Sequence, residues 1–174
     1  MDLRLRSYKG KRPQLGKRAY VDPCATLVGD IQLGDDASIW PMVAARGDVN
    51  HIRIGARSNI QDGTVVHLSH GAPTIIGDDV TVGHGAILHG CTLEDKSFVG
   101  MGSTLLDGAV VESGAMLGAG ALLTQGKRVP SGQLWGGSPA HYLRDLRPEE
   151  IENFAPHAWK YVELSREYSA EAVV

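Results

Sequence analysis

Branched aliphatic residues recur at every sixth position through most of the chain. A period of six fits neither the 3.6-residue turn of an α-helix nor the alternation of a half-buried hairpin. It fits short strands joined by tight turns, three strands to a coil, and so predicts an all-β fold, a parallel β-helix of hexapeptide repeats. Seventeen of the eighteen positions are Val, Ile or Leu, and the other is Ala: Val21, Leu27, Leu33, Ile39, Ala45, Ile54, Ile60, Val66, Ile76, Val82, Leu88, Leu93, Val99, Leu105, Val111, Leu117, Leu123 and Val129.

The limits of this series predict three segments. We expect residues 1–18 to form a lead-in strand, residues 19–135 the β-helix, and residues 136–174 a turn and a C-terminal helix packed on the β-helix. The series stops after Pro130, and the run of Gly, Ser and Pro at 136–139 predicts the turn. Pro148 suits the first turn of a helix that extends to Tyr168, and Pro156 predicts a break within it.

Composition and charge exclude several classes of protein. The 174 residues suit one domain, and 17 basic against 20 acidic residues give a formal net charge of −3, without attraction to nucleic acid. No apolar run approaches the roughly 18 residues of a membrane helix. We therefore expect no nucleic-acid partner and no membrane. The two cysteines lack metal or disulfide spacing, and no charged-then-apolar leader opens the chain, which favours a cytoplasmic protein.

Three of the seven histidines occupy positions that the repeat relates to one another. His67 and His89 each follow an inward aliphatic residue, 22 residues apart, and four of these residues belong to a predicted loop between Val66 and Ile76. The other 18 make one coil, so the two imidazoles should stack about 4.8 Å apart and can share one metal ion. His84 lies on the preceding side of the prism and faces away. A neighbouring prism around a threefold axis would bring His84 to the pair, which predicts a homotrimer, unless these are simply surface histidines.

Three segments carry a resemblance to a known family. They are RGDVN at 46–50, NIQDG at 59–63, and the run from Gly83 to Cys91 that contains two of the histidines. From Ala19 to Tyr168 the chain resembles the gamma-class carbonic anhydrases. The resemblance implies a left-handed β-helix trimer with a C-terminal helix and a divalent metal at each subunit interface. It implies His67 and His89 of one subunit and His84 of the next as ligands, with Zn²⁺ the default metal and Fe²⁺ or Co²⁺ as alternatives.

The same resemblance gives roles to polar residues near the histidines. One glutamine would orient water or bicarbonate, one tyrosine would lie near the metal, and an arginine–aspartate pair would cross the subunit interface. These roles fall to Gln61 and Tyr161 as catalytic residues, and to Arg46, Asp48 and Asn59 as interface or supporting residues. Separately, the repeat places Asp62 one coil below His84, where it can accept the second imidazole N–H.

The sequence also departs from the family pattern. Active members carry a glutamate directly after the aspartate that matches Asp48, and an acidic loop between the first two ligand histidines. Val49 stands in the first place here, and no carboxylate lies between His67 and Asp78. Hydration of CO2 requires export of a proton in each cycle, so the loss of both carboxylates predicts a low rate. His70, in the short loop, is the candidate replacement shuttle.

These observations leave three functions open. The resemblance implies a carbonic anhydrase-like lyase, in which a zinc hydroxide attacks CO2 and gives bicarbonate, with low or no activity. The second possibility is a non-catalytic trimeric assembly protein that a metal stabilises. The third is a hexapeptide acyltransferase that uses coenzyme A, for which Gly137–Ala140 is a similar coil-ending segment.

Overall fold

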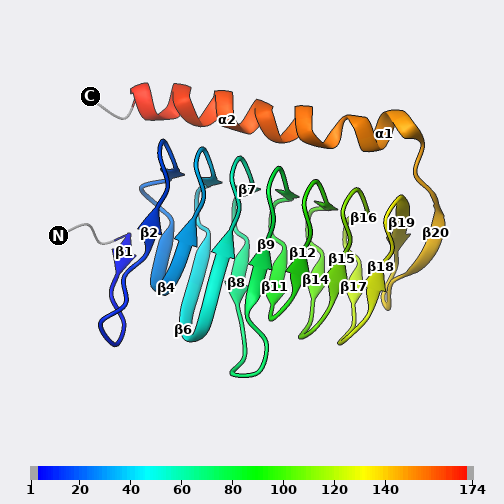
Figure 1. Cartoon of the computed structure of the whole chain (residues 1–174), viewed down its shortest axis with the longest axis horizontal. Helices are drawn as coiled ribbons and strands as arrows, with labels where there is room; N and C mark the ends of the chain where they lie inside the picture. Colours follow the sequence, from blue (N-terminus) through cyan, green and yellow to red (C-terminus); the bar gives the residue numbers. More distant parts are fainter. Residues whose placement is uncertain (1–3, 172–174) are drawn as a thin grey trace.

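The inward residues of the six-residue series build the core. A computed structural model describes residues 4–171, which form a parallel β-helix with a helix along one side (Figure 1). All eighteen residues of the series are buried, and none is more than 6% exposed. The predicted fold class, a mostly-β parallel solenoid with a C-terminal helix, is therefore confirmed.

The strands stack on three faces, joined by tight turns. The first face holds β1 (Leu5–Arg6), β8 (Val65–His67), β11 (Ile87–His89), β14 (Thr104–Leu105) and β17 (Leu122–Leu123). The second holds β2 (Gln14–Leu15), β9 (Thr74–Ile76), β12 (Thr92–Leu93), β15 (Val110–Val111) and β18 (Arg128–Val129). The third holds β3 (Tyr20–Val21), β5 (Ser38–Ile39), β7 (Asn59–Ile60), β10 (Thr81–Val82), β13 (Phe98–Val99), β16 (Met116–Leu117) and β19 (Gln133–Gly136). Two longer strands, β4 (Thr26–Leu33) and β6 (Ala44–Ile54), contribute to both the first and the second face.

Both ends of the solenoid contain strands that the six-residue series of aliphatic positions does not predict. The N-terminal segment, predicted as one lead-in strand, provides the two short strands β1 and β2, which both pair with β4. After the last coil, where the sequence predicts only a turn, strand β20 (His141–Asp145) pairs antiparallel with β19. All five residues of β20 are exposed, so no inward aliphatic residue marks it in the sequence.

The C-terminal helix has two parts, α1 (Pro148–Glu152) and α2 (Phe154–Glu171), which run back along the solenoid from its last coil to its first (Figure 1). The interruption falls at Asn153, and Pro156 lies in the first turn of α2, where its missing N–H costs no helical bond. The buried residues of α2 are Phe154, Ala158, Val162 and Ser165, and α2 packs on β3, β5, β7 and β10 of the third face. Within the described range, neither helix has the length and apolarity needed to cross a bilayer.

Truncating one inward residue tests the stacked core. Leu88 is fully buried and lies in register between Val66 and Leu105 on neighbouring coils. We expect Leu88→Ala to lower the free energy of unfolding by about 2–5 kcal/mol, because the prism closes poorly over the cavity. Leu15→Ala, at a position 41% exposed, is the control and should change it by less than about 0.5 kcal/mol. Urea unfolding measures both, and equal losses would contradict the stacked interior.

Candidate functional site

Two of the predicted histidines lie side by side on the first face. Strands β8 and β11 pair with His67 opposite His89, as the 18-residue coil predicts. The imidazole centroids are 5.1 Å apart, and His67 Nδ1 and His89 Nε2 are 3.2 Å apart. Two nitrogens bound about 2.05 Å from one tetrahedral ion lie about 3.3 Å apart. The spacing of this pair therefore suits two ligands of a single metal ion.

A carboxylate occupies the other ring nitrogen of each histidine. Asp48 Oδ1 lies 3.2 Å from His67 Nε2, and Asp107 Oδ1 lies 2.5 Å from His89 Nδ1. Because a carboxylate accepts hydrogen bonds and does not donate them, these contacts assign an N–H to the outer nitrogen of each ring. In the neutral form of both rings, the two inner nitrogens, which face each other, carry the lone pairs.

Electrostatics keep both carboxylates ionised. Burial raises the pKa of Asp48, but hydrogen bonds from Arg46, His67 and the Val49 N–H outweigh it and lower the pKa to about 2. Asp48 also forms an ion pair with Arg46 in the same chain. The pKa of Asp107 is lowered by hydrogen bonds from His89 and Ser69, against a smaller effect of burial.

The third predicted ligand lies elsewhere on the chain. His84 follows β10, which belongs to the third face, and its Nδ1 lies 3.0 Å from Asp62 Oδ2, the contact that the register predicts. The His84 side chain is 51% exposed. Within residues 4–171, no three His, Cys, Asp or Glu side chains of one chain converge on a common point for a metal. The structure thus brings His67 and His89 together and leaves His84 apart from them.

Several predicted polar residues form a buried network beneath α2. Gln61 Nε2 donates to Asn59 Oδ1 at 3.0 Å, and Asn59 Nδ2 donates to Thr81 Oγ1 at 3.0 Å. Thr81 Oγ1 is in turn 3.3 Å from His157 Nδ1 on α2. Asn59 is fully buried and Gln61 is 4% exposed. The network fixes the orientation of the Gln61 amide, and Thr81 and His157 are members that the sequence does not identify.

Tyr161 lies beside this network and lines a small cavity. It packs edge-on against Trp40 and near the ring of His157. Burial and the charge of Asp62 raise the pKa of Tyr161, against a hydrogen bond from Gln61 that lowers it, so its phenol stays protonated. The cavity of about 280 Å³ lies between the solenoid and α2, and its lining is Gln61, Gly83, His84, Phe98, Gly100, Met101, Met116, Ala119, His157 and Tyr161. It therefore joins three predicted site residues, Gln61, Tyr161 and His84.

The short loop after β8 carries the remaining predicted residue. His70 is exposed, and its carbonyl accepts a hydrogen bond from Asn50 Nδ2 at 3.0 Å. An isolated bridge between Ser69 and Ala72 closes the loop. The imidazole of His70 is thus open to solvent at a loop that begins two residues after His67.

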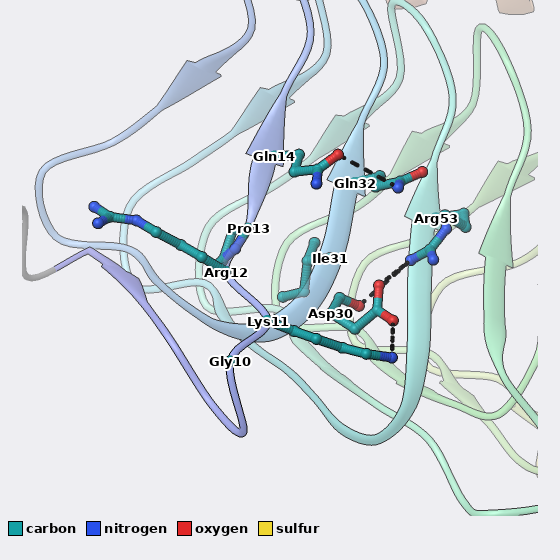
Figure 2. Close-up of a pocket in the computed structure, with 9 residues that line it drawn as sticks. All are labelled: Gly10, Lys11, Arg12, Pro13, Gln14, Asp30, Ile31, Gln32 and Arg53. Carbon is teal, nitrogen blue, oxygen red and sulfur yellow. Dashed lines mark hydrogen bonds and ion pairs between the residues drawn. The ribbon is translucent and has the colours of Figure 1, made fainter.

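A second hollow lies away from the histidines, near the N-terminal coils. This hollow has a volume of about 560 Å³ and three cations in its lining, Lys11, Arg12 and Arg53. Figure 2 shows that Lys11 and Arg53 both point to Asp30, with Nζ and Nη1 at 2.7 and 2.8 Å from its carboxylate, while Arg12 points away. Two of the three cations are therefore paired with the same carboxylate.

Comparisons with known proteins find hexapeptide-repeat proteins, some of which are named carbonic anhydrases. Residues 73–107 match the family model described as the hexapeptide repeat of succinyl-transferase. Gamma carbonic anhydrase 1, mitochondrial, of Arabidopsis thaliana is 48% identical over 167 residues, which cover 92% of this chain and 61% of that protein, so the chain spans less than two thirds of its length. A probable carbonic anhydrase of Methanocaldococcus jannaschii is 52% identical over 151 residues, covering 87% of this chain and 95% of that one. The crystal structure of a hexapeptide transferase family protein from Anaplasma phagocytophilum has a TM-score of 0.93 and 48% identity, covering 97% of this chain and 99% of that one.

Proposed function

Because the chain belongs to the gamma carbonic anhydrase family of hexapeptide-repeat proteins, we propose that it forms a homotrimer that binds zinc between subunits and hydrates CO2 to bicarbonate slowly. One observation carries the proposal. His67 Nδ1 and His89 Nε2 lie 3.2 Å apart, and when both rings are neutral these two atoms carry the lone pairs, because each carboxylate accepts the N–H of the other ring nitrogen. Facing lone pairs repel each other, and a cation between them turns the repulsion into coordination.

The donor set suits zinc. Neutral imidazoles bind Zn²⁺ well, and three of them leave a fourth position open for water or substrate. His67, His89 and the partner subunit's His84 would hold the ion. When bound, such an ion acidifies water and so supplies a nucleophile near neutral pH. Fe²⁺ and Co²⁺ also suit imidazole ligands.

The surface beside the histidine pair supports assembly. Val65 and Ile87 stack next to each other on the outside of the first face, and they are 43% and 44% exposed. Exposed branched residues beside a site that has two of its three ligands favour contact with another protein surface. A second copy of this chain can offer what is missing, since His84 has one ring nitrogen on Asp62 and keeps Nε2 for a ligand. Head-to-tail contacts of this kind close into a ring, and three copies give the trimer.

The residues of this chain would position substrate and water. The Gln61 amide is held by Asn59, and Gln61 is one of the residues that line the cavity. The protonated phenol of Tyr161 can donate a hydrogen bond there. The apolar remainder of the lining, including Phe98 and Met101, suits a small uncharged molecule such as CO2 better than an ion.

Removing the metal tests this proposal. We expect one metal ion per chain, and a mass in sedimentation equilibrium of three chains of 18.6 kDa. Binding at about 1,000 times the dissociation constant stabilises the native state by about 4 kcal/mol. A chelator should therefore lower the melting temperature by about 8–16 °C and favour dissociation of the trimer. Zinc, but not magnesium, should reverse both changes.

Other outcomes of the same measurements point to other functions. A trimer with metal but no CO2 hydration in any buffer favours the non-catalytic assembly protein. A protein that holds no metal and binds coenzyme A favours an acyltransferase. If a chelator changes neither the melting temperature nor the mass, the proposed shared metal site is wrong.

A further inference from the structure

We infer that Asp107 is a positioning residue of the metal site, which holds His89 in the orientation and the tautomer that a metal requires. The inference rests on the proposed metal site. Asp107 Oδ1 lies 2.5 Å from His89 Nδ1, a shorter contact than either of the other two histidine–carboxylate pairs, at 3.2 and 3.0 Å. Such a bond to an ionised carboxylate is about twice as strong as one between neutral groups.

The bond decides which nitrogen of His89 can bind a metal. A neutral imidazole carries one proton, and Asp107 keeps it on Nδ1 because the carboxylate only accepts. The lone pair is then on Nε2, the atom that lies 3.2 Å from His67 Nδ1. Without Asp107, the ring can move its proton to Nε2 or rotate away, and either change removes a ligand.

The fold holds Asp107 in this position. The hydroxyl of Ser69, in the loop after β8, lies close enough to Asp107 to lower the pKa of its carboxyl. Asn50 Nδ2 in turn fixes that loop through the carbonyls of Ser69 and His70, at 3.3 and 3.0 Å. The four-residue insertion that interrupts the repeat thus provides a support for the carboxylate beside His89.

Gly90 leaves the space through which Asp107 reaches the ring. It has a φ of +58°, and a Cβ at this position would lie 2.5 Å from Asp107 Oδ1. Any larger residue would therefore displace the carboxylate. Glycine at position 90 therefore permits both the turn and the contact between Asp107 and His89.

Asp107 also differs from the other carboxylate of the pair. Asp48 divides its oxygens between His67, Arg46 and the Val49 N–H, and so helps to bind the RGDVN segment. Among the described residues, the side-chain hydrogen bond that the structure gives for Asp107 is the one with His89. Replacing Asp107 should therefore affect His89 more than it affects the surrounding fold.

Cobalt binding tests the inference. Metal-free Asp107→Asn is titrated with Co²⁺ and followed by the visible absorption of the bound ion. We expect an affinity about 10–100-fold weaker than that of the unchanged chain, with an altered cobalt spectrum. The asparagine amide can donate to Nδ1, which places the His89 proton on Nε2. The control is Asp95→Asn, since Asp95 Oδ1 accepts the Asp78 N–H at 2.8 Å at a turn away from the histidines, and it should bind Co²⁺ normally.

The outcomes separate this inference from the proposed function. If the unchanged chain binds no Co²⁺, the metal site and the inference both fail. If it binds Co²⁺ and Asp107→Asn binds it equally tightly with the same spectrum, only the inference fails. Should Asp107→Asn not fold, Ser69→Ala decides instead, because it removes the support of Asp107 and leaves the carboxylate. A several-fold loss of affinity is expected for Ser69→Ala, and unchanged affinity would overturn the inference.

Discussion

Two variants that each fail to bind metal alone are expected to recover part of the metal binding when they are co-expressed. His67→Ala removes one ligand from the stacked pair, and His84→Ala removes the ligand that lies apart, so each variant alone should bind almost no zinc. Two remaining imidazoles are too few for a tight site. In mixed trimers, however, some sites combine an intact pair from a His84→Ala chain with an intact His84 from a His67→Ala chain.

The expected amount follows from the arrangement of the ligands. At equal expression, each site receives an intact pair in half of all cases and an intact His84 in half, so about one quarter of the sites are complete. Metal analysis of the purified mixture measures this fraction.

A second mixture provides the control. His67→Ala and His89→Ala both damage the same pair, so their mixed trimers contain no complete site and should stay free of zinc. If the site lay within one chain, neither mixture would recover metal. Recovery in both mixtures would show that the three histidines do not divide between subunits as proposed.

Hydration of CO2 by the unchanged, zinc-loaded protein is expected to be slow and to rise markedly with added imidazole. The proposed ligands are all present, so the limit should lie in moving the proton to bulk water. Val49 cannot carry a proton, and the segment from Leu68 to Gly77 has one titratable side chain, that of His70. Stopped-flow assays in imidazole and in a bulky buffer at equal pH measure the difference.

The variant His70→Ala completes this experiment. His70 is exposed, and an imidazole can accept a proton at one ring nitrogen and release one from the other, as a shuttle requires. If the unchanged protein is fast and His70→Ala is slow, the expectation of a low rate is wrong and His70 is the shuttle. If imidazole changes neither rate, proton transfer is not the limit.

The solenoid could be predicted because each coil repeats the same physical requirement. An inward position in a narrow prism accepts a branched aliphatic residue, and the structure buries all of them from Val21 to Val129. The same spacing predicted the pairing of His67 with His89. Strand β20 was missed, because an exposed strand that pairs antiparallel at the end of the stack needs no inward residue.

The supporting residues were harder to predict, because their contacts cross between elements. The spacing of 18 residues that relates the histidine pair also separates His89 from Asp107, and this signal was available in the sequence. His157 was not predictable in the same way. It reaches Thr81 from α2, 76 residues away, and no repeat relates a helix to the face that it covers. The strand register predicts which residues are neighbours within the β-helix. It does not predict which residues of α2 pack against the β-helix.

The return of α2 along the solenoid changes how the repeats can come apart. In a repeat array, the terminal coils have neighbours on one side only, so such arrays fray from their ends. Here α2 begins beside β13 of the third face, where Phe154 contacts Phe98, and finishes on the first coils, where Arg166 Nη2 lies 3.2 Å from Asp36 Oδ1 and Tyr168 packs against Trp40. The first coils therefore cannot peel away without also releasing the helix from the coils between β5 and β13. We therefore expect the coils that α2 covers to unfold together rather than one after another.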